Sequence, residues 1–154
     1  MQKYHFKLQP LLDKELIYED KCVRSMKKLQ DEFLDTKDKL EKLVKHVIKY
    51  QKELKIKKEH QISPSELKLY EDYFLRLDKE TINRKYTLKE NKKKLETAQT
   101  KLLKIVKRRK ALEKLKERGM EEHRNNLALL LNKEMDDIAM LKFINSRGVN
   151  AIYH

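Results

Sequence analysis

The chain contains few of the residues that bend, crosslink or interrupt a fold. Its 154 residues include two glycines, two prolines, no tryptophan and a single cysteine, Cys22. One cysteine excludes an internal disulfide, and two glycines exclude a glycine-rich loop for binding phosphate. Charged residues make up 41% of the chain, a composition typical of long helices and coiled coils. We therefore expect one elongated domain that is stabilised by a narrow apolar seam.

Long apolar runs are also missing. The longest, residues 127–131, has five residues, whereas a helix needs about 20 to cross a membrane. Residues 1–9 lack the apolar stretch of a signal peptide. The five histidines are never four residues apart, so with one cysteine they cannot form a zinc cluster. The sequence therefore predicts a cytoplasmic protein that is not an enzyme and needs no metal, cofactor or small-molecule substrate.

One short segment, Ser63-Pro64-Ser65-Glu66, separates two long heptad patterns. Ser63 is a favourable N-cap because its hydroxyl can accept the backbone N–H of Glu66, and Pro64 suits the first helical position. Apolar seams on either side of a tight turn predict an all-α fold: a long antiparallel two-helix coiled coil whose second helix overhangs the first. The expected boundaries are helix one at 10–61, the turn at 62–66, the paired part of helix two at 64–118, its overhang at 119–144 and a flexible tail at 145–154.

The two seams follow from alternating steps of four and three residues, starting at Leu12 and Leu67. Nine of thirteen positions in the first seam and ten of fourteen in the second are apolar. The first seam contains Leu12, Leu16, Glu19, Val23, Met26, Gln30, Phe33, Lys37, Leu40, Val44, Val47, Gln51 and Leu54. The second contains Leu67, Tyr70, Phe74, Leu77, Thr81, Arg84, Leu88, Asn91, Leu95, Ala98, Leu102, Ile105, Arg109 and Leu112. Cys22 falls beside the first seam, where we expect a small buried thiol.

A turn centred near residue 64 sets the register of these seams, because the numbers of facing residues should then sum to about 128. Two polar layers follow, with Glu19 opposite Arg109 and Lys37 opposite Asn91. Arg84 faces an apolar residue and should turn outward. The apolar pairs are Leu16 with Leu112, Val23 with Ile105, Met26 with Leu102, Phe33 with Leu95, and Leu40 with Leu88.

The second helix is longer than the first, so beyond Lys116 we expect it to have no partner within the chain. Its regular seam lapses at Gly119. A new apolar stripe then follows, which predicts a binding partner or self-association. The stripe consists of Leu127, Leu130, Leu131, Met135, Ile138 and Leu141.

The net charge of +13 is concentrated in residues 76–124, which carry 18 basic and eight acidic side chains. The densest runs are residues 92–94 and 107–110. Such a stripe attracts nucleic acid, anionic lipid or an acidic protein surface without distinguishing among them. Interleaved glutamates and the lack of an ordered aromatic platform count against nucleic acid. The narrow seam, already used for packing, counts against a membrane surface.

Aromatic residues gather near the turn. Tyr70 and Phe74 lie on the second seam, where packing explains them, whereas Tyr50 and Tyr73 lie beside the seams. Exposed tyrosine at the tip of a hairpin is typical of a contact surface. Packing and partner recognition therefore both remain open for Tyr50 and Tyr73.

Three stretches carry a family resemblance that extends over nearly the whole chain. Residues 6–13, FKLQPLLD, resemble the opening of the FliJ family, the small coiled-coil component of the bacterial flagellar type III export apparatus. Residues 110–118, KALEKLKER, and residues 134–139, EMDDIA, are similar to the family's basic, glutamate-rich segment and its acidic pair near the C-terminus. Injectisomes contain a stalk of the same shape, but the FKLQPLLD opening favours the flagellar family.

The resemblance implies a role in flagellum assembly and motility. FliJ proteins are similar to the central stalk of rotary ATPases, so the chain is expected to bind and stimulate the hexameric export ATPase, FliI. It would also link the ATPase to the export gate protein, FlhA, at the cytoplasmic face of the inner membrane, and export chaperones are possible further partners. By position, the ATPase-binding residues are Leu102, Lys107, Arg108, Arg109, Lys110 and Arg118, and the gate-binding residues are Tyr50, Tyr73 and Leu77.

Overall fold

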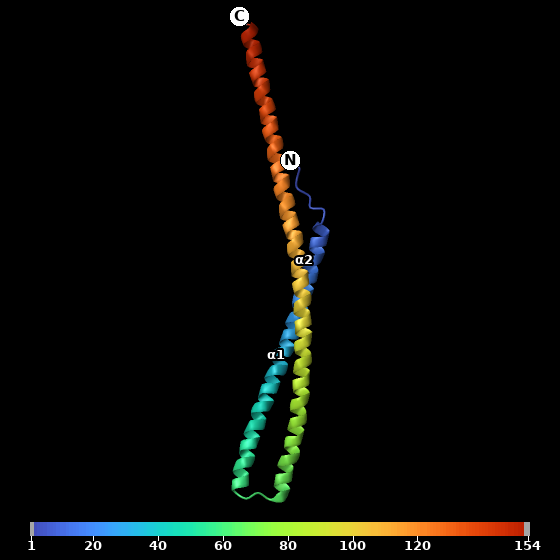
Figure 1. The fold of residues 1–154 in the computed structure, drawn as a ribbon, viewed down its shortest axis with the longest axis vertical. Coiled ribbons are helices and arrows are strands. Elements are labelled where there is room, and N and C mark those ends of the chain that lie inside the picture. The colour runs from blue at the N-terminus through green and yellow to red at the C-terminus, as the bar shows by residue number, and fades with distance from the viewer. Residues whose placement is uncertain (1, 153–154) are drawn as a thin grey trace. The chain divides into compact units, whose positions relative to one another are not determined.

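The computed structural model describes residues 2–152, with side chains for residues 2–149. It contains two helices, α1 (Gln9–Glu59) and α2 (Pro64–Ile152), and no strand within the described residues (Figure 1). The helices pack against each other as an α-helical hairpin, which confirms the predicted fold class. Helix α2 runs on to Ile152, whereas a flexible tail was expected at 145–154, of which residues 153–154 lie outside the described part of the chain.

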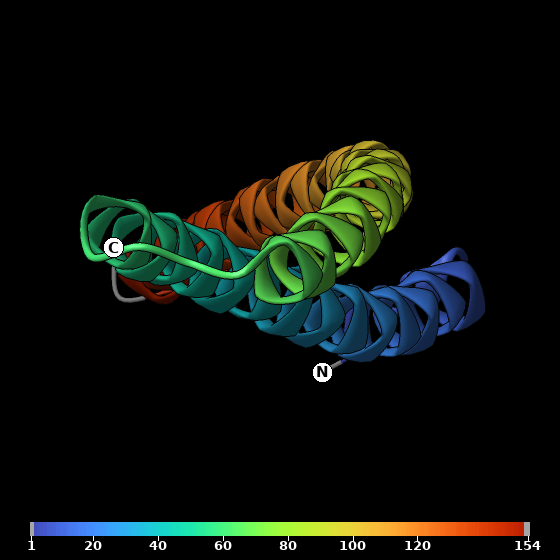
Figure 2. The same cartoon turned by 90° about the horizontal axis from the view of Figure 1, so that it is seen from below.

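Residues 60–63 connect the two helices, and Ser63 caps α2 as its sequence predicts (Figure 2). The hydroxyl of Ser63 accepts the backbone N–H of Glu66 at 3.2 Å, and its carbonyl accepts the N–H of Leu67 at 3.0 Å. At the end of α1, the N–H of His60 donates to the carbonyl of Lys57 at 3.2 Å, and Gln61 follows with a φ of 61°. A left-handed residue just after a helix is a common way to end it.

The chain divides into two compact units, and each helix passes through both. Unit 1 comprises residues 2–16 and 107–152, and unit 2 comprises residues 17–106. The hairpin turn belongs to unit 2.

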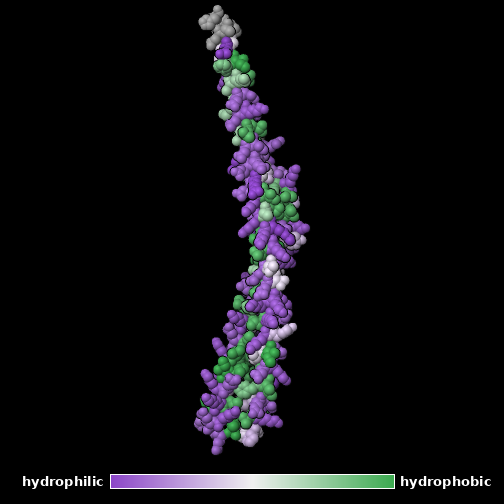
Figure 3. All heavy atoms as spheres, viewed as in Figure 1, coloured by the Kyte–Doolittle hydropathy of each residue, from purple (hydrophilic) through white to green (hydrophobic). Residues whose placement is uncertain are grey.

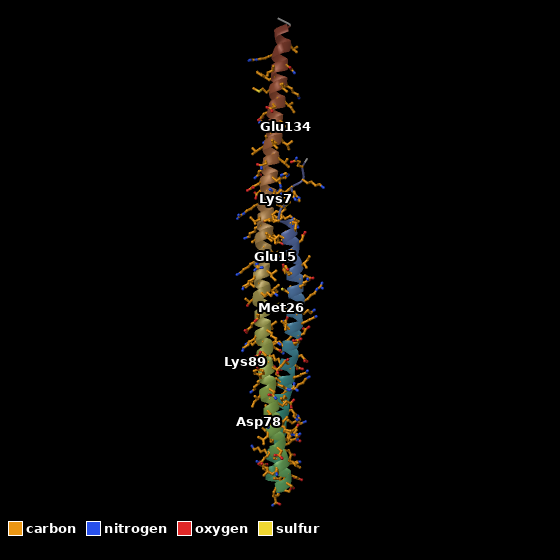
Figure 4. All side chains as sticks on the ribbon, turned by 90° about the vertical axis from the view of Figure 1, so that its right-hand side faces the viewer. Lys7, Glu15, Met26, Asp78, Lys89 and Glu134 are labelled. Atoms are coloured by element: carbon orange, nitrogen blue, oxygen red, sulfur yellow. The ribbon has the colours of Figure 1, made fainter. Side chains whose placement is uncertain are left out.

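Within unit 2, the seam of α2 is the predicted one. Every predicted position from Leu67 to Ile105 is half-buried or buried, and Leu77 and Ile105 are the least exposed. The seam of α1 agrees at every seventh residue from Glu19, which includes Met26, labelled in Figure 4. The α2 pattern could be read directly because its apolar positions fit only one alternation.

The other half of the predicted α1 seam is wrong by one residue. Cys22 is half-buried, whereas Val23 remains 43% exposed. A heptad seam can alternate its steps as three then four residues, or as four then three. The two patterns share every seventh residue and differ by one residue at the position between, which is where the prediction went wrong. The half-buried residues at those positions are Cys22, Leu29, Thr36, Leu43 and Tyr50, in place of Val23, Gln30, Lys37, Val44 and Gln51.

A polar layer of unit 2 shows the consequence of this shift. Asn91 donates its side-chain N–H to the hydroxyl of Thr36 at 3.0 Å, and the same hydroxyl donates to the carbonyl of Glu32 at 2.8 Å. The predicted partner of Asn91, Lys37, is exposed. The layer therefore consists of two neutral groups, which are less costly to bury than a lysine.

Unit 1 has a small apolar core of its own. Phe6, Leu12 and Leu112 are each at most 9% exposed and pack together, with Tyr4 against them. Leu16, the predicted partner of Leu112, is 43% exposed, and Glu15 takes the half-buried position beside it. Residues 2–8 precede α1 and lie along α2, so the expectation of a helix without an intramolecular partner beyond Lys116 is wrong.

Candidate binding surfaces

The first candidate surface is an aromatic cluster near the turn, in unit 2. Tyr50 of α1 lies at its centre, with ring centroids 4.7 Å from Tyr73, 5.5 Å from Tyr70 and 6.1 Å from Phe74. Residues three and four apart share one face of a helix, which brings the three α2 rings together. Aromatic rings at these tilted and edge-on geometries attract one another beyond their apolar contact.

Polar groups surround these rings. Nε2 of His46 and the hydroxyl of Tyr73 share a hydrogen bond of 2.8 Å, in which the histidine tautomer decides the donor. The Lys57 ammonium lies 5.1 Å from the centre of the Tyr70 ring, and the Arg76 guanidinium lies 5.8 Å from that of Tyr73. A hydrogen bond with the Tyr70 side chain raises the pKa of Lys57 above its ordinary value, and interaction with the charge of Glu66 raises it further.

Tyrosines and cations of this cluster line an open groove of about 400 Å³. Leu69 forms part of its wall and is 69% exposed, so an apolar side chain is presented beside two cations. Such a mixture of aromatic, apolar and cationic groups is typical of protein contact surfaces. The lining residues are Tyr50, Lys57, Glu66, Leu69, Tyr70, Tyr73 and Arg76.

The predicted gate-binding residues occupy unequal positions. Leu77 is only 5% exposed, so it packs within unit 2 and offers little surface to a partner. Tyr50 lies on the α1 seam rather than beside it, and both Tyr50 and Tyr73 are half-buried walls of the groove. Leu69 and Arg76 were not predicted, although they lie four residues before and three residues after Tyr73, a spacing that places all three on one helix face.

The second candidate surface is the basic segment of α2 in unit 1. Lys107, Arg108 and Lys110 are exposed, and none forms an ion pair among residues 2–149. Arg109 is different, because one of its nitrogens donates to both carboxylate oxygens of Glu113, at 2.9 and 3.0 Å. Three of the four charges predicted here are therefore available to a partner.

The other two predicted ATPase-binding residues lie on either side of this run. Leu102 is a half-buried seam residue of unit 2, and Arg118 is exposed in unit 1. Packing accounts for Leu102, so Arg118 is the more accessible of the two.

Residues 2–8, which we call the N-terminal strap, cover α2 just beyond Arg118. Nε2 of His123 hydrogen-bonds to the carbonyl of Gln2 at 3.0 Å, and its ring centroid lies 5.7 Å from that of Tyr4. The phenol of Tyr4 lies directly over Gly119. The strap was not predicted because it has no heptad pattern, although a glycine in the interior of a long helix can mark a close contact.

Neither a metal site nor a membrane span occurs in the part of the chain that the structure describes. Among the described residues there is no group of three or more histidine, cysteine, aspartate or glutamate side chains that could hold a metal ion. No helix in the described part of the chain is long and apolar enough to cross a membrane.

A helical hairpin with heptad seams, an exposed basic run and an aromatic groove near its turn defines an all-α coiled-coil protein. A comparison with protein families identifies it further. The family model described as "Flagellar FliJ protein" matches residues 4–148, and the chain belongs to the FliJ family. It is therefore a flagellar export apparatus protein. No curated protein and no solved structure matches the chain.

Proposed function

We propose that the chain acts as a stalk that binds and stimulates the hexameric export ATPase and links it to the export gate. Family membership supports the setting, and the exposed charges of Lys107, Arg108 and Lys110 support the ATPase contact. The neighbouring seam residue Leu112 is covered by the chain itself, whereas these three cations are exposed. They can therefore make charge-assisted contacts to acidic loops of a partner.

Stimulation requires that the stalk contact different states of the ATPase ring unequally, since a ligand with equal affinity for all states shifts none of them. Several cations on one helix meet this requirement, because they can engage different subunits as the ring changes. The proposal also includes export chaperones as binding partners, and a location at the cytoplasmic face of the inner membrane through the export apparatus.

ATP hydrolysis by the cognate export ATPase, with and without this protein, tests the proposal. The triple variant Lys107→Glu/Arg108→Glu/Lys110→Glu should weaken stimulation about tenfold or more. A loss of this size corresponds to at least one charge-assisted hydrogen bond. Lys92→Glu/Lys93→Glu/Lys94→Glu is the matched control, because it makes the same change of charge on exposed residues of the same helix. Equal loss in both triples would indicate general attraction to a polyanion, and full stimulation by the first triple would refute the assignment.

The gate contact is proposed for the groove near the turn. Leu69→Ala should weaken binding to the soluble part of the gate protein, measured by calorimetry, by about tenfold if Leu69 is an anchor residue. Leu75→Ala is its control, since Leu75 is similarly exposed on α2 but does not line the groove. Unchanged binding for Leu69→Ala would remove the groove from the proposal without affecting the ATPase contact.

A further inference from the structure

The C-terminal part of α2 carries many apolar side chains that nothing in the described chain covers. All residues from Ala128 to Val149 are exposed, and the larger apolar ones are each at least 50% exposed. Figure 3 shows them as green side chains among purple ones along this part of the helix, and Figure 4 labels Glu134 where α2 has no other segment beside it. The apolar residues are Leu129, Leu130, Leu131, Met135, Ile138, Met140, Leu141, Phe143, Ile144 and Val149.

These residues form an ordered stripe rather than a scattered set. With 3.6 residues per turn, one face of the helix carries a heptad pattern over residues 127–148. This central face contains Leu127, Leu131, Glu134, Ile138, Leu141 and Asn145. One flank of the face carries Leu130, Asp137 and Ile144, and the other carries Met135, Lys142 and Val149.

The two flanks complement each other. The first flank carries an apolar, an acidic and an apolar residue, and the second carries an apolar, a basic and an apolar residue. Each residue of the first flank is five positions before its counterpart on the second: 130 and 135, 137 and 142, 144 and 149. In a parallel two-stranded coiled coil, each residue on one flank meets the residue five positions later on the opposite flank of its partner. The stripe is therefore complementary to itself in a parallel, in-register pair.

We propose that residues 127–149 pair with the same residues of a second copy of the chain, parallel and in register. Ile138 and Leu141 of the two copies then pack in successive layers, and each Asp137 meets Lys142 of the second copy. Five residues apart, these two side chains do not face each other within one helix, and neither forms an ion pair among residues 2–149.

Two further observations favour a second copy as the occupant. Residues 127–149 carry three basic and three acidic side chains, so two copies of this segment do not repel each other as residues 76–124 would. Asn145 lies at a central position where a single asparagine specifies the register and number of strands in parallel coiled coils.

Glu134 opposes the pairing, because two copies would place two carboxylates side by side on the central face. Glu134→Gln should tighten self-association severalfold, since it removes the repulsion and leaves a group that can hydrogen-bond across the pair. A surface built for a basic partner would instead lose affinity for that partner.

Sedimentation equilibrium of the full chain over a wide concentration range tests the pairing. The wild type should reach a dimer, and Asp137→Lys or Lys142→Asp should each weaken it about tenfold, because each creates two like-charged pairs per dimer. The double variant Asp137→Lys/Lys142→Asp should restore association. Lys133→Asp, which makes the same change of charge on the other side of the helix, should have little effect.

A crosslink fixes the orientation. Leu131→Cys in a Cys22→Ser background should form a disulfide between copies under mild oxidation, because parallel pairing places the two residues in one layer. Antiparallel pairing about the middle of the segment would separate them by about 20 Å. A wild type that stays monomeric at every concentration, or charge reversals that the double variant does not rescue, would overturn the proposal. None of these measurements involves the ATPase or the gate, so the outcome is independent of the proposed function.

Discussion

The phenol of Tyr4 occupies the space in which a Cβ on residue 119 would stand. Gly119 is therefore required by a contact with the N-terminal strap, although it lies in the interior of an 89-residue helix where glycine is unfavourable by about 1 kcal/mol relative to alanine. The strap contact offsets part of this cost. Removing either partner should separate the two effects.

Gly119→Ala should loosen the strap while strengthening the helix. The new methyl group displaces Tyr4, so amide protons of residues 2–8 should exchange faster, while the free energy of unfolding changes little. In a Tyr4→Ala background the collision is gone, and the same substitution should stabilise by about 1 kcal/mol. Gly148→Ala is the control, because open space surrounds that residue. A strap that stays protected in Gly119→Ala would contradict the account.

The hydrogen bond between Asn91 and Thr36 should appear as a coupling energy. Thr36→Val and Asn91→Ala should each destabilise by about 1 kcal/mol, and the double variant by less than their sum. Urea unfolding of the four proteins gives the coupling. Thr97→Val serves as a control, since the hydroxyl of Thr97 bonds to the carbonyl of Lys93 in its own helix and the residue is exposed. Strict additivity would show that the observed bond contributes nothing.

Glu15 occupies a half-buried seam position, and its Oε2 atom has no hydrogen-bond partner among the described residues. Glu15→Leu should therefore raise the free energy of unfolding by about 1–2 kcal/mol, because it removes an unsatisfied oxygen and adds apolar contact. Glu41→Leu, at an exposed position of the same helix, should change it by less than about 0.5 kcal/mol. Destabilisation by Glu15→Leu would indicate a role for the carboxylate that its surroundings do not reveal.

Lys57 should lose its stabilising interaction in strong alkali. Its pKa is raised in the folded protein, so its contribution to stability is complete below the ordinary value of 10.5 and is lost as the pH rises through the folded value. Tyr70→Phe removes the main cause and should lower the pKa of Lys57, as measured by NMR titration of its side chain. Tyr73→Phe should leave it unchanged. An unaltered pKa in Tyr70→Phe would rule out the hydrogen bond as the cause.

Sequence patterns predicted the hairpin because each part of it leaves a local signal. Ser63 and Pro64 mark a helix start by their own chemistry, and the α2 seam repeats often enough to define its register. The α1 seam was half wrong because its polar positions leave the order of the three- and four-residue steps undecided, and only the packed partner decides it. Thr36, rather than Lys37, faces Asn91 for this reason.

The binding surfaces were less predictable, because they depend on contacts between distant residues. Leu77 and Leu69 look equally apolar in the sequence, yet one is buried and the other forms a wall of the groove. Likewise, nothing in residues 2–8 indicates that they lie along α2. Only the position of Gly119 hinted at that contact.

The strap also determines how the protein can be labelled. Residues fused ahead of Gln2 emerge beside His123 and close to Arg118, so an N-terminal affinity tag crowds the surface proposed to meet the ATPase. An epitope inserted in the connection from His60 to Ser63, which is exposed except for a half-buried Ile62, leaves that surface clear but lies between Lys57 and Glu66 of the groove proposed to meet the gate. Preparations with a tag at the N-terminus and at this turn should therefore differ in behaviour although they contain the same chain.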